Sequence, residues 1–220
     1  MRRYIFYILS FVAAIFSSDY LMAESWTGQT KGTFTLDGNV NISEMVVLTG
    51  DLTITADKSW TIKATKDMWC VFQVKANQTL TIKGLSGAVI TIDGGGDLSE
   101  LHFTQNMDRF SPSAIGGVKL EESILSRAGL YLQNVTICNV NGYKGEDTDN
   151  SDKYGGAICI KGNSTGFRTS TIDNCHIHHC ATYSGSAVYF NCEQNKGTFI
   201  KGSEDCKVII SNSIIENCYS

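Results

Sequence analysis

The chain has 220 residues, with 18 basic and 22 acidic side chains that give a formal net charge of -4. This length suits a single domain and leaves no room for a multidomain enzyme. The acidic balance provides no cationic surface for a phosphate backbone, so we expect no nucleic-acid partner.

The first 23 residues have the pattern of a Sec-type signal peptide. Arg2 and Arg3 precede an uncharged apolar stretch, residues 4–16, that is too short to span a bilayer. We expect cleavage after Ala23, and an uncleaved anchor is the alternative. No later segment is apolar enough to be a transmembrane segment. The mature chain, residues 24–220, is therefore expected to be secreted or held at the cell surface.

Residues 30–96 have the composition of short β-strands. β-Branched runs are separated by Gly, Asn and Asp, as in GTFTL, GDLTITA, WTIKAT, CVFQVKA, QTLTIKG and AVITIDGGG. Helical periodicity is missing. The chain has 21 glycines and a single proline, Pro112, so the glycines do not belong to a disordered Pro/Gly-rich tract and instead mark turns between strands. The segment 97–128 fits this pattern poorly, and we expect an irregular insertion there.

The C-terminal half contains an internal repeat. Segments 132–140, 172–180 and 210–218 align at offsets of 40 and then 38 residues. A second element with a glycine turn and a small-residue strand recurs at 155–160 and 185–190. This organisation predicts an all-β fold, a right-handed parallel β-helix over 24–220, whose coils stack about 4.8 Å apart. The acidic segment 142–154 is expected to be a lateral loop.

Stacking of the repeats predicts columns of equivalent residues. One column, at a bend between strands, holds Asn134, Asn174 and Asn212. Asn tolerates left-handed backbone geometry, and stacked amides can form a hydrogen-bonded ladder, so this role is structural. A second turn column holds Asn139, His179 and Asn217. Alternation directs two columns inward, Val135/Cys175/Ser213 and Ile137/Ile177/Ile215, and two outward, Thr136/His176/Ile214 and Cys138/His178/Glu216.

These motifs resemble a known superfamily. Gly155-Gly156-Ala157-Ile158 followed by Ile172-Asp173-Asn174-Cys175-His176 resembles the coils of the pectate-lyase-like right-handed β-helix superfamily. More narrowly, it is similar to the repeats of polymorphic outer-membrane proteins and related bacterial adhesins, although the Phe-x-x-Asn element of those repeats is not cleanly present. The superfamily includes lyases, hydrolases, adhesins and passenger domains, so the resemblance implies the fold and no single function.

The most metal-like stretch is Cys175-His176-x-His178-His179-Cys180. On a strand His176 and His178 share one face and Cys175 lies on the other, so these groups cannot close a tetrahedral zinc site, and we expect surface histidines with no metal. The outward column of Cys138, His178 and Glu216 has the residue types of a nucleophile, a base and an orienting acid. No oxyanion donors accompany them, so coincidence is the favoured interpretation.

The resemblance implies where an enzyme of this fold would carry its chemistry. Hydrolases of the superfamily use clustered aspartates, and lyases use calcium ligands with a basic residue, on the outer face of the coils. The candidates here are Asp93, Asp97, Arg168 and His178 for catalysis, His176, His178 and Glu216 for ligand binding, and Asp147, Asp149 and Asp152 for calcium. No Asp-Asp pair with a partnering His-Gly is present, and Asp152 stands where a calcium loop requires glycine. We therefore expect no cofactor, with calcium as the alternative.

Eight cysteines in an exported chain invite disulfides. Most lie within apolar strand-like runs, where a thiol packs as a small hydrophobe, so we expect one to three bridges. Cys180 and Cys218 occupy the same repeat position in adjacent coils. A bridge and two packed thiols are both possible there, and we favour thiols.

The sequence thus favours an exported bacterial β-helix that acts as an adhesin or extracellular carbohydrate-binding module, with a surface glycan or host protein as partner. The alternative is a lyase or hydrolase of uronate-containing polysaccharide. The last repeat reaches Cys218 when a new coil is due, so we also expect further C-terminal coils or an anchoring domain. Without them, the last coil is expected to fray or associate.

Overall fold

The computed structural model describes residues 24–98, 116–117, 120–126, 128–142, 156–163, 169–182, 186–193 and 207–219. The expected signal peptide and its cleavage site, most of the loop 142–154, and Arg168 lie outside these residues. All regular structure in the described part of the chain is β-strand. None of these residues forms a helix of the length and apolarity that a membrane span requires.

Three parallel sheets form the fold. Sheet A contains, in spatial order, β1 (Glu24–Ser25), β3 (Val40–Ile42), β6 (Trp60–Ala64), β9 (Ile90–Asp93), β14 (Val135–Asn141), β17 (His176–Ala181) and β20 (Ile214–Tyr219). Sheet B contains β2 (Gly32–Leu36), β5 (Leu52–Ala56), β8 (Thr79–Gly84), β13 (Gly129–Gln133), β16 (Ser170–Asp173) and β19 (Val208–Ser211). Sheet C contains β4 (Val46–Val47), β7 (Met68–Val74), β12 (Leu120–Ser126), β15 (Ile158–Asn163) and β18 (Val188–Glu193).

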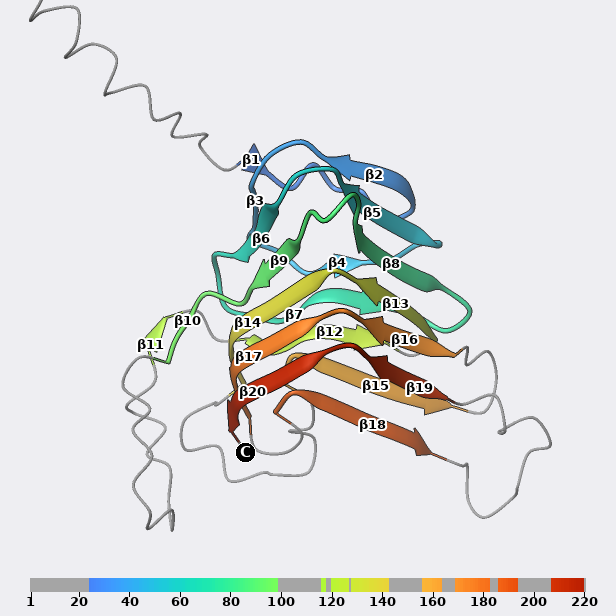
Figure 1. Ribbon diagram of the computed structural model, residues 1–220, viewed down its shortest axis with the longest axis vertical. Helices are drawn as coiled ribbons and strands as arrows, with labels where there is room; N and C mark the ends of the chain where they lie inside the picture. The colour runs from blue at the N-terminus through green and yellow to red at the C-terminus, as the bar shows by residue number, and fades with distance from the viewer. Residues whose placement is uncertain are drawn as a thin grey trace, which may run out of the picture.

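The chain visits the sheets in a fixed order, B then A then C, and returns to sheet B one step further along. For example, β5, β6 and β7 form one coil, and β13, β14 and β15 form a later one (Figure 1). Ile172 of β16 pairs with Leu132 of β13 and with Ile210 of β19, which confirms the offsets of 40 and 38 residues. The protein is therefore a parallel β-helix.

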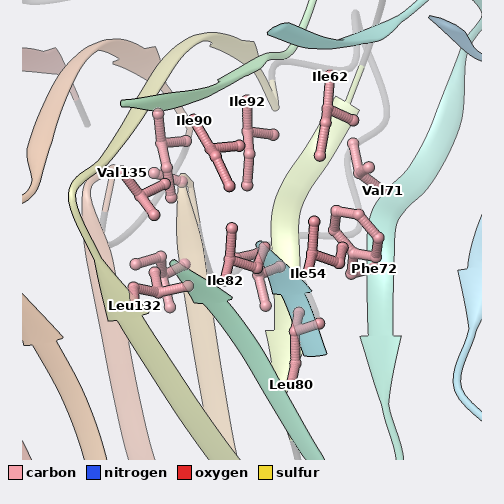
Figure 2. Packing of buried hydrophobic residues seen from close by; sticks show 14 of the residues in the cluster. Ile54, Ile62, Val71, Phe72, Leu80, Ile82, Ile90, Ile92, Leu132 and Val135 are labelled. Carbon is pink, nitrogen blue, oxygen red and sulfur yellow. The ribbon is translucent and has the colours of Figure 1, made fainter. Parts of the chain in front are cut away.

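The interior is filled by stacked columns of aliphatic side chains. Alternation along each strand sends every second side chain inward, and the inner positions of sheets A and B are mostly isoleucine and leucine. Ile62, Ile92, Ile137 and Ile177 follow one another in register and are fully buried. Figure 2 shows side chains from the three sheets, among them Ile62, Phe72 and Ile82, meeting in this common core.

The first coils are packed by aromatic rings. Trp26 makes edge-on contacts with Phe34 of β2 and Phe72 of β7, at centroid distances of 5.1 and 5.9 Å.

At the other end of the β-helix, Ile210 of β19 and Ile215 of β20 occupy inner columns and are each 45% exposed. Among the described residues, β20 pairs only with β17, so one side of Ile215 has no stacked neighbour.

The bends between sheets B and A use left-handed residues. Asn134, Asn174 and Asn212 have φ of 56°, 49° and 50°. The second turn column, Asn139, His179 and Asn217, has φ of 57°, 52° and 50°. Left-handed geometry is therefore present at both turn columns that the repeat indicated, and asparagine is among the residues that adopt it at least cost.

The segment 97–128 contains a regular coil strand. β10 (Gly96–Asp97) and β11 (Gly116–Gly117) form a small antiparallel pair that leaves the helix. Leu120 then begins β12, which pairs in parallel with β7 and β15. The coil thus resumes inside the segment expected to be irregular, because the polar residues at the start of β12 hide the alternation that marks the other strands.

Candidate functional site

One outward column of sheet A contains most of the chemically reactive candidates. Backbone register places Lys63, Asp93, Cys138, His178 and Glu216 on five successive strands, β6, β9, β14, β17 and β20. The stacking of Cys138, His178 and Glu216 that the repeat predicted is therefore present, and it extends to Asp93. Register alone does not make these residues a catalytic group, because Asp93 also bonds to Asn139 and Glu216 bonds to His176, both outside the column.

Asp93 is occupied by structural contacts. Its Oδ1 accepts hydrogen bonds from the Gly95 backbone N–H at 2.9 Å and from Asn139 Nδ2 at 3.0 Å. Its Oδ2 lies 3.6 Å from Lys63 Nζ. The carboxylate therefore holds the turn after β9 against the turn inside β14, a role that leaves its oxygens poorly placed to act as an acid or base on a substrate.

Cys138 is in register with the outward residues Asp93 and His178 and is nevertheless only 7% exposed. Burial, together with the negative charge of Asp93, raises the pKa of this thiol to about 12, and Lys63 only partly opposes that rise. A nucleophilic cysteine needs a depressed pKa. The arrangement therefore does not support a nucleophile at Cys138.

The three histidines around residue 178 form a compact cluster with Glu216. His176 Nε2 lies 2.9 Å from Glu216 Oε1, and the two nitrogens His178 Nδ1 and His179 Nδ1 lie 2.7 Å apart. The rings of His176 and His178 are 4.4 Å apart between centroids. Partial burial lowers the pKa of His178, and the nearby imidazoles of His176 and His179 lower it further, against the opposing charge of Glu216. His178 is therefore neutral near pH 7.

The asparagine column makes side-chain contacts along the helix axis. Asn174 Nδ2 donates to Asn134 Oδ1 at 2.7 Å, and Asn134 Nδ2 donates to the Gly84 carbonyl at 2.7 Å. Asn212 departs from this pattern, because its Nδ2 donates instead to Asp173 Oδ1 at 2.9 Å.

Asp173 is a residue that the sequence analysis did not single out. Its carboxylate also accepts from Ser211 Oγ at 2.8 Å and from Gln133 Nε2 at 3.3 Å. The hydrogen bonds from Asn212 and Ser211 lower the pKa of this half-buried carboxyl group. Its position directly before the asparagine column was the available signal.

Threonine columns on the outer faces were also missed. On sheet B, Thr33, Thr53 and Thr81 are in register, and Thr171 continues this column beyond Tyr131. On sheet A, another column holds Thr61, Thr91 and Thr136. The repeated Thr-x-Thr pattern of residues 33–35 and 53–55 was the sequence signal for the column on sheet B.

The remaining candidates do not join a common site. Asp97 is exposed in β10, on the antiparallel pair that leaves the coils. Arg168, Asp147, Asp149 and Asp152 lie outside the described residues. Within the part of the chain that is described, no three His, Cys, Asp or Glu side chains surround a common point as a bound metal would require.

Two hollows lie beside Trp26, at the N-terminal end of the β-helix. They measure about 190 and 350 Å³, and both are lined by Ser25 and Trp26. None of the candidate catalytic or ligand-binding residues lines either of them. Trp26 Nε1 is buried without a hydrogen-bond partner and therefore offers no accessible donor to a ligand there.

Six cysteines in the described part of the chain are thiols in this structure: Cys70, Cys138, Cys159, Cys175, Cys180 and Cys218. The Cys180 and Cys218 thiols each donate to a backbone carbonyl of their own strand, at 3.3 Å from His178 O and Glu216 O. The hydrogen bond with the Cys218 sulfur makes the largest contribution to a raised pKa of the Cys180 thiol, and burial makes the second largest. Cysteines stacked on adjacent parallel strands have side chains that run side by side, which separates the Cβ atoms by more than the roughly 3.8 Å typical of a disulfide.

We therefore predict that Cys180 and Cys218 remain thiols in the purified protein. Alkylation of unfolded, unreduced protein followed by peptide mapping should label both residues. Cys138, which is buried on the outer side of the same sheet, is the internal control and should be labelled to the same extent. A mapped bridge between residues 180 and 218 would contradict this prediction.

Comparison with known proteins gives no assignment, because no protein family, curated protein or solved structure matches the chain.

Proposed function

We propose that the chain is an extracellular binding protein, an adhesin or carbohydrate-binding module exported by a bacterium and displayed at or beyond the cell surface. Its motifs favour membership of the pectate-lyase-like superfamily. A surface glycan or a host protein is the proposed partner, and its binding to the outer faces of the coils needs no cofactor. The proposal rests on the distribution of polar groups over the outer faces of the coils.

The main support is the pair of polar columns on sheet B. Thr33, Thr53 and Thr81 stack in one column, and beside it Thr35, Thr55 and Lys83 stack in a second. Adjacent strands place equivalent hydroxyls about 4.8 Å apart. Such a surface offers a repeated set of donors and acceptors, which suits a ligand that is itself a repeating chain of hydroxyl groups.

The contacts within these columns leave hydrogen-bonding capacity for a ligand. Thr35 and Thr55 share one hydrogen bond of 3.3 Å between their Oγ atoms, and a hydroxyl can make up to three. Thr33 is exposed, and Thr53 and Thr81 are half-exposed. The face therefore presents hydroxyls on a rigid scaffold, so little conformational entropy is lost on binding.

The competing proposal, a polysaccharide lyase or hydrolase, has less support. Asp93 is committed to Gly95, Asn139 and Lys63, and burial raises the pKa of Cys138. Among the described residues, no three His, Cys, Asp or Glu side chains are placed to hold a metal ion such as the calcium that a lyase of this fold would use.

The double variant Thr53→Val/Thr81→Val tests the binding face, because valine keeps the shape and the strand preference and removes only the hydroxyls. On an array of bacterial and host glycans, we expect the wild-type protein to bind a defined subset. Loss of two hydrogen bonds of about 1 kcal/mol each should weaken that binding by roughly tenfold or more. The matched control is Thr61→Val/Thr91→Val on sheet A, which should bind as the wild type does.

Equal loss in both double variants, or binding unaffected by either, would contradict a site on sheet B. Incubation of the same protein with pectate, alginate and chondroitin, with and without calcium, distinguishes the competing proposal. Formation of unsaturated products or new reducing ends, abolished by Asp93→Ala, would replace the binding function by an enzymatic one.

A further inference from the structure

The histidine cluster on sheet A has a donor set that the proposed glycan binding does not use. His176 and His178 alternate along β17 with Ile177, so both lie on the outer face while Ile177 is fully buried. Glu216 comes from β20 in the next coil and is in register with His178. Two imidazoles and one carboxylate are thus gathered from two coils on one exposed surface.

The separations in this cluster are close to those between ligands of one metal ion. Two donors that are each 2.0–2.1 Å from a tetrahedral zinc ion lie roughly 3.3 Å apart. His176 Nε2 and Glu216 Oε1 are 2.9 Å apart, and the His176 and His178 rings are 4.4 Å apart between centroids. Small movements of these side chains would open the contact between His176 and Glu216 to the separation that a shared cation needs.

The side chains have the freedom to make these movements. His176 and Glu216 are 38% and 52% exposed. As they lie, no three such groups surround a common point, because His178 Nδ1 faces His179 Nδ1. That contact occupies Nδ1 and leaves Nε2 of His178 as the nitrogen to turn toward the other two donors. Tethering Nδ1 to a neighbour is also how metal-bound imidazoles are commonly oriented.

We propose that His176, His178 and Glu216 bind one divalent transition metal ion, with Zn²⁺ the best match, on the outer face of sheet A. Imidazole nitrogens favour Zn²⁺, Ni²⁺ and Cu²⁺ over Mg²⁺ and Ca²⁺, and two histidines with one glutamate form a known three-ligand zinc set. Water completes the coordination. The site is open, in contrast to the closed tetrahedral centre that the sequence excludes, and it exists only when two coils are stacked.

The proposal is tested by calorimetric titration of the full-length chain with zinc chloride at pH 7.5. We expect one equivalent to bind to the wild-type protein. The variants His176→Gln and His178→Gln should each weaken binding by at least about tenfold. Glu216→Gln should weaken it less, because the amide oxygen can still reach the metal, although it is a poorer ligand than the carboxylate. Lowering the pH to 5.5 should also weaken binding, since protonated imidazole cannot bind the metal.

His102→Gln is the matched control, because His102 is the only histidine outside the cluster of His176, His178 and His179, and its replacement should leave the affinity unchanged. Titration with Co²⁺ separates histidine from cysteine ligation. A sulfur-to-cobalt charge-transfer band that disappears in Cys218→Ser would assign the metal to the thiols and overturn the proposal. Equal affinity of the wild type and His176→Gln would overturn it as well.

A measurement on the wild-type protein covers the case in which a variant fails to fold. Zn²⁺ should protect His176 and His178 from modification by diethylpyrocarbonate, whereas His102 should react at the same rate with and without the ion. Modification of His176 and His178 that Zn²⁺ does not slow would overturn the proposal.

Discussion

Replacing Ile137 by alanine is expected to destabilise the protein by about 2–5 kcal/mol, the usual cost of truncating a fully buried aliphatic side chain to alanine. Ile137 is fully buried between Ile92 and Ile177 in an inner column of sheet A. A cavity there interrupts the column, and the surrounding structure cannot easily close it because Ile92 and Ile177 are held by backbone pairing on both sides. Chemical denaturation followed by circular dichroism measures the change.

Two controls separate burial from general damage to the strand. Thr136→Ala changes the adjacent, outward residue and should cost about 1 kcal/mol or less. Ile215→Ala is the same substitution at the equivalent position of β20, where the side chain is 45% exposed, and should cost clearly less than Ile137→Ala. Similar losses at residues 137 and 215 would show that the inner columns are not packed as described.

Asn134→Ala is expected to destabilise the protein by about 3–4 kcal/mol. Asn134 has φ of 56°, and an alanine in left-handed geometry costs roughly 1–2 kcal/mol. The substitution also removes the hydrogen bonds to the Gly84 carbonyl and from Asn174 Nδ2, each worth about 1 kcal/mol. The same denaturation experiment measures this loss.

Asn134→Gly distinguishes the two causes. Glycine adopts the left-handed backbone without a steric penalty and lacks the side-chain hydrogen bonds. It should therefore be more stable than Asn134→Ala by about 1 kcal/mol and less stable than the wild type. A glycine variant as stable as the wild type would mean that the contacts along the asparagine column contribute nothing to stability.

The repeat and the strand alternation were sufficient to predict the parallel β-helix. Parallel stacking puts equivalent residues in register, so an offset of 40 residues between two similar segments translates directly into the pairing of Leu132 with Ile172. The period of two along each strand then assigns Ile137 and Ile177 to the core. The turn columns followed as well, because few residues other than asparagine and glycine enter left-handed geometry cheaply.

The first coils show the limit of that reasoning. Thr53 pairs with Thr33 and with Thr81, at offsets of 20 and 28 residues. Unequal offsets leave no period in the sequence, although the strands themselves were recognisable. The stacking of these strands, which creates the threonine columns of sheet B, depends on which strand edges meet when the chain closes each coil. Only the three-dimensional structure shows that pairing.

The candidate site on sheet A was likewise predictable only in part. Register predicted from the sequence brought Cys138, His178 and Glu216 into one column, but it could not say how far each side chain is covered or where it bonds. Glu216 reaches across to His176 instead of His178, and Cys138 is buried. The parallel β-helix and the alignment of its columns were thus predictable from the amino-acid pattern, because both follow from backbone periodicity. The side-chain contacts and the pKa shifts were not, since they depend on side-chain rotamers and on coils that are distant in the chain.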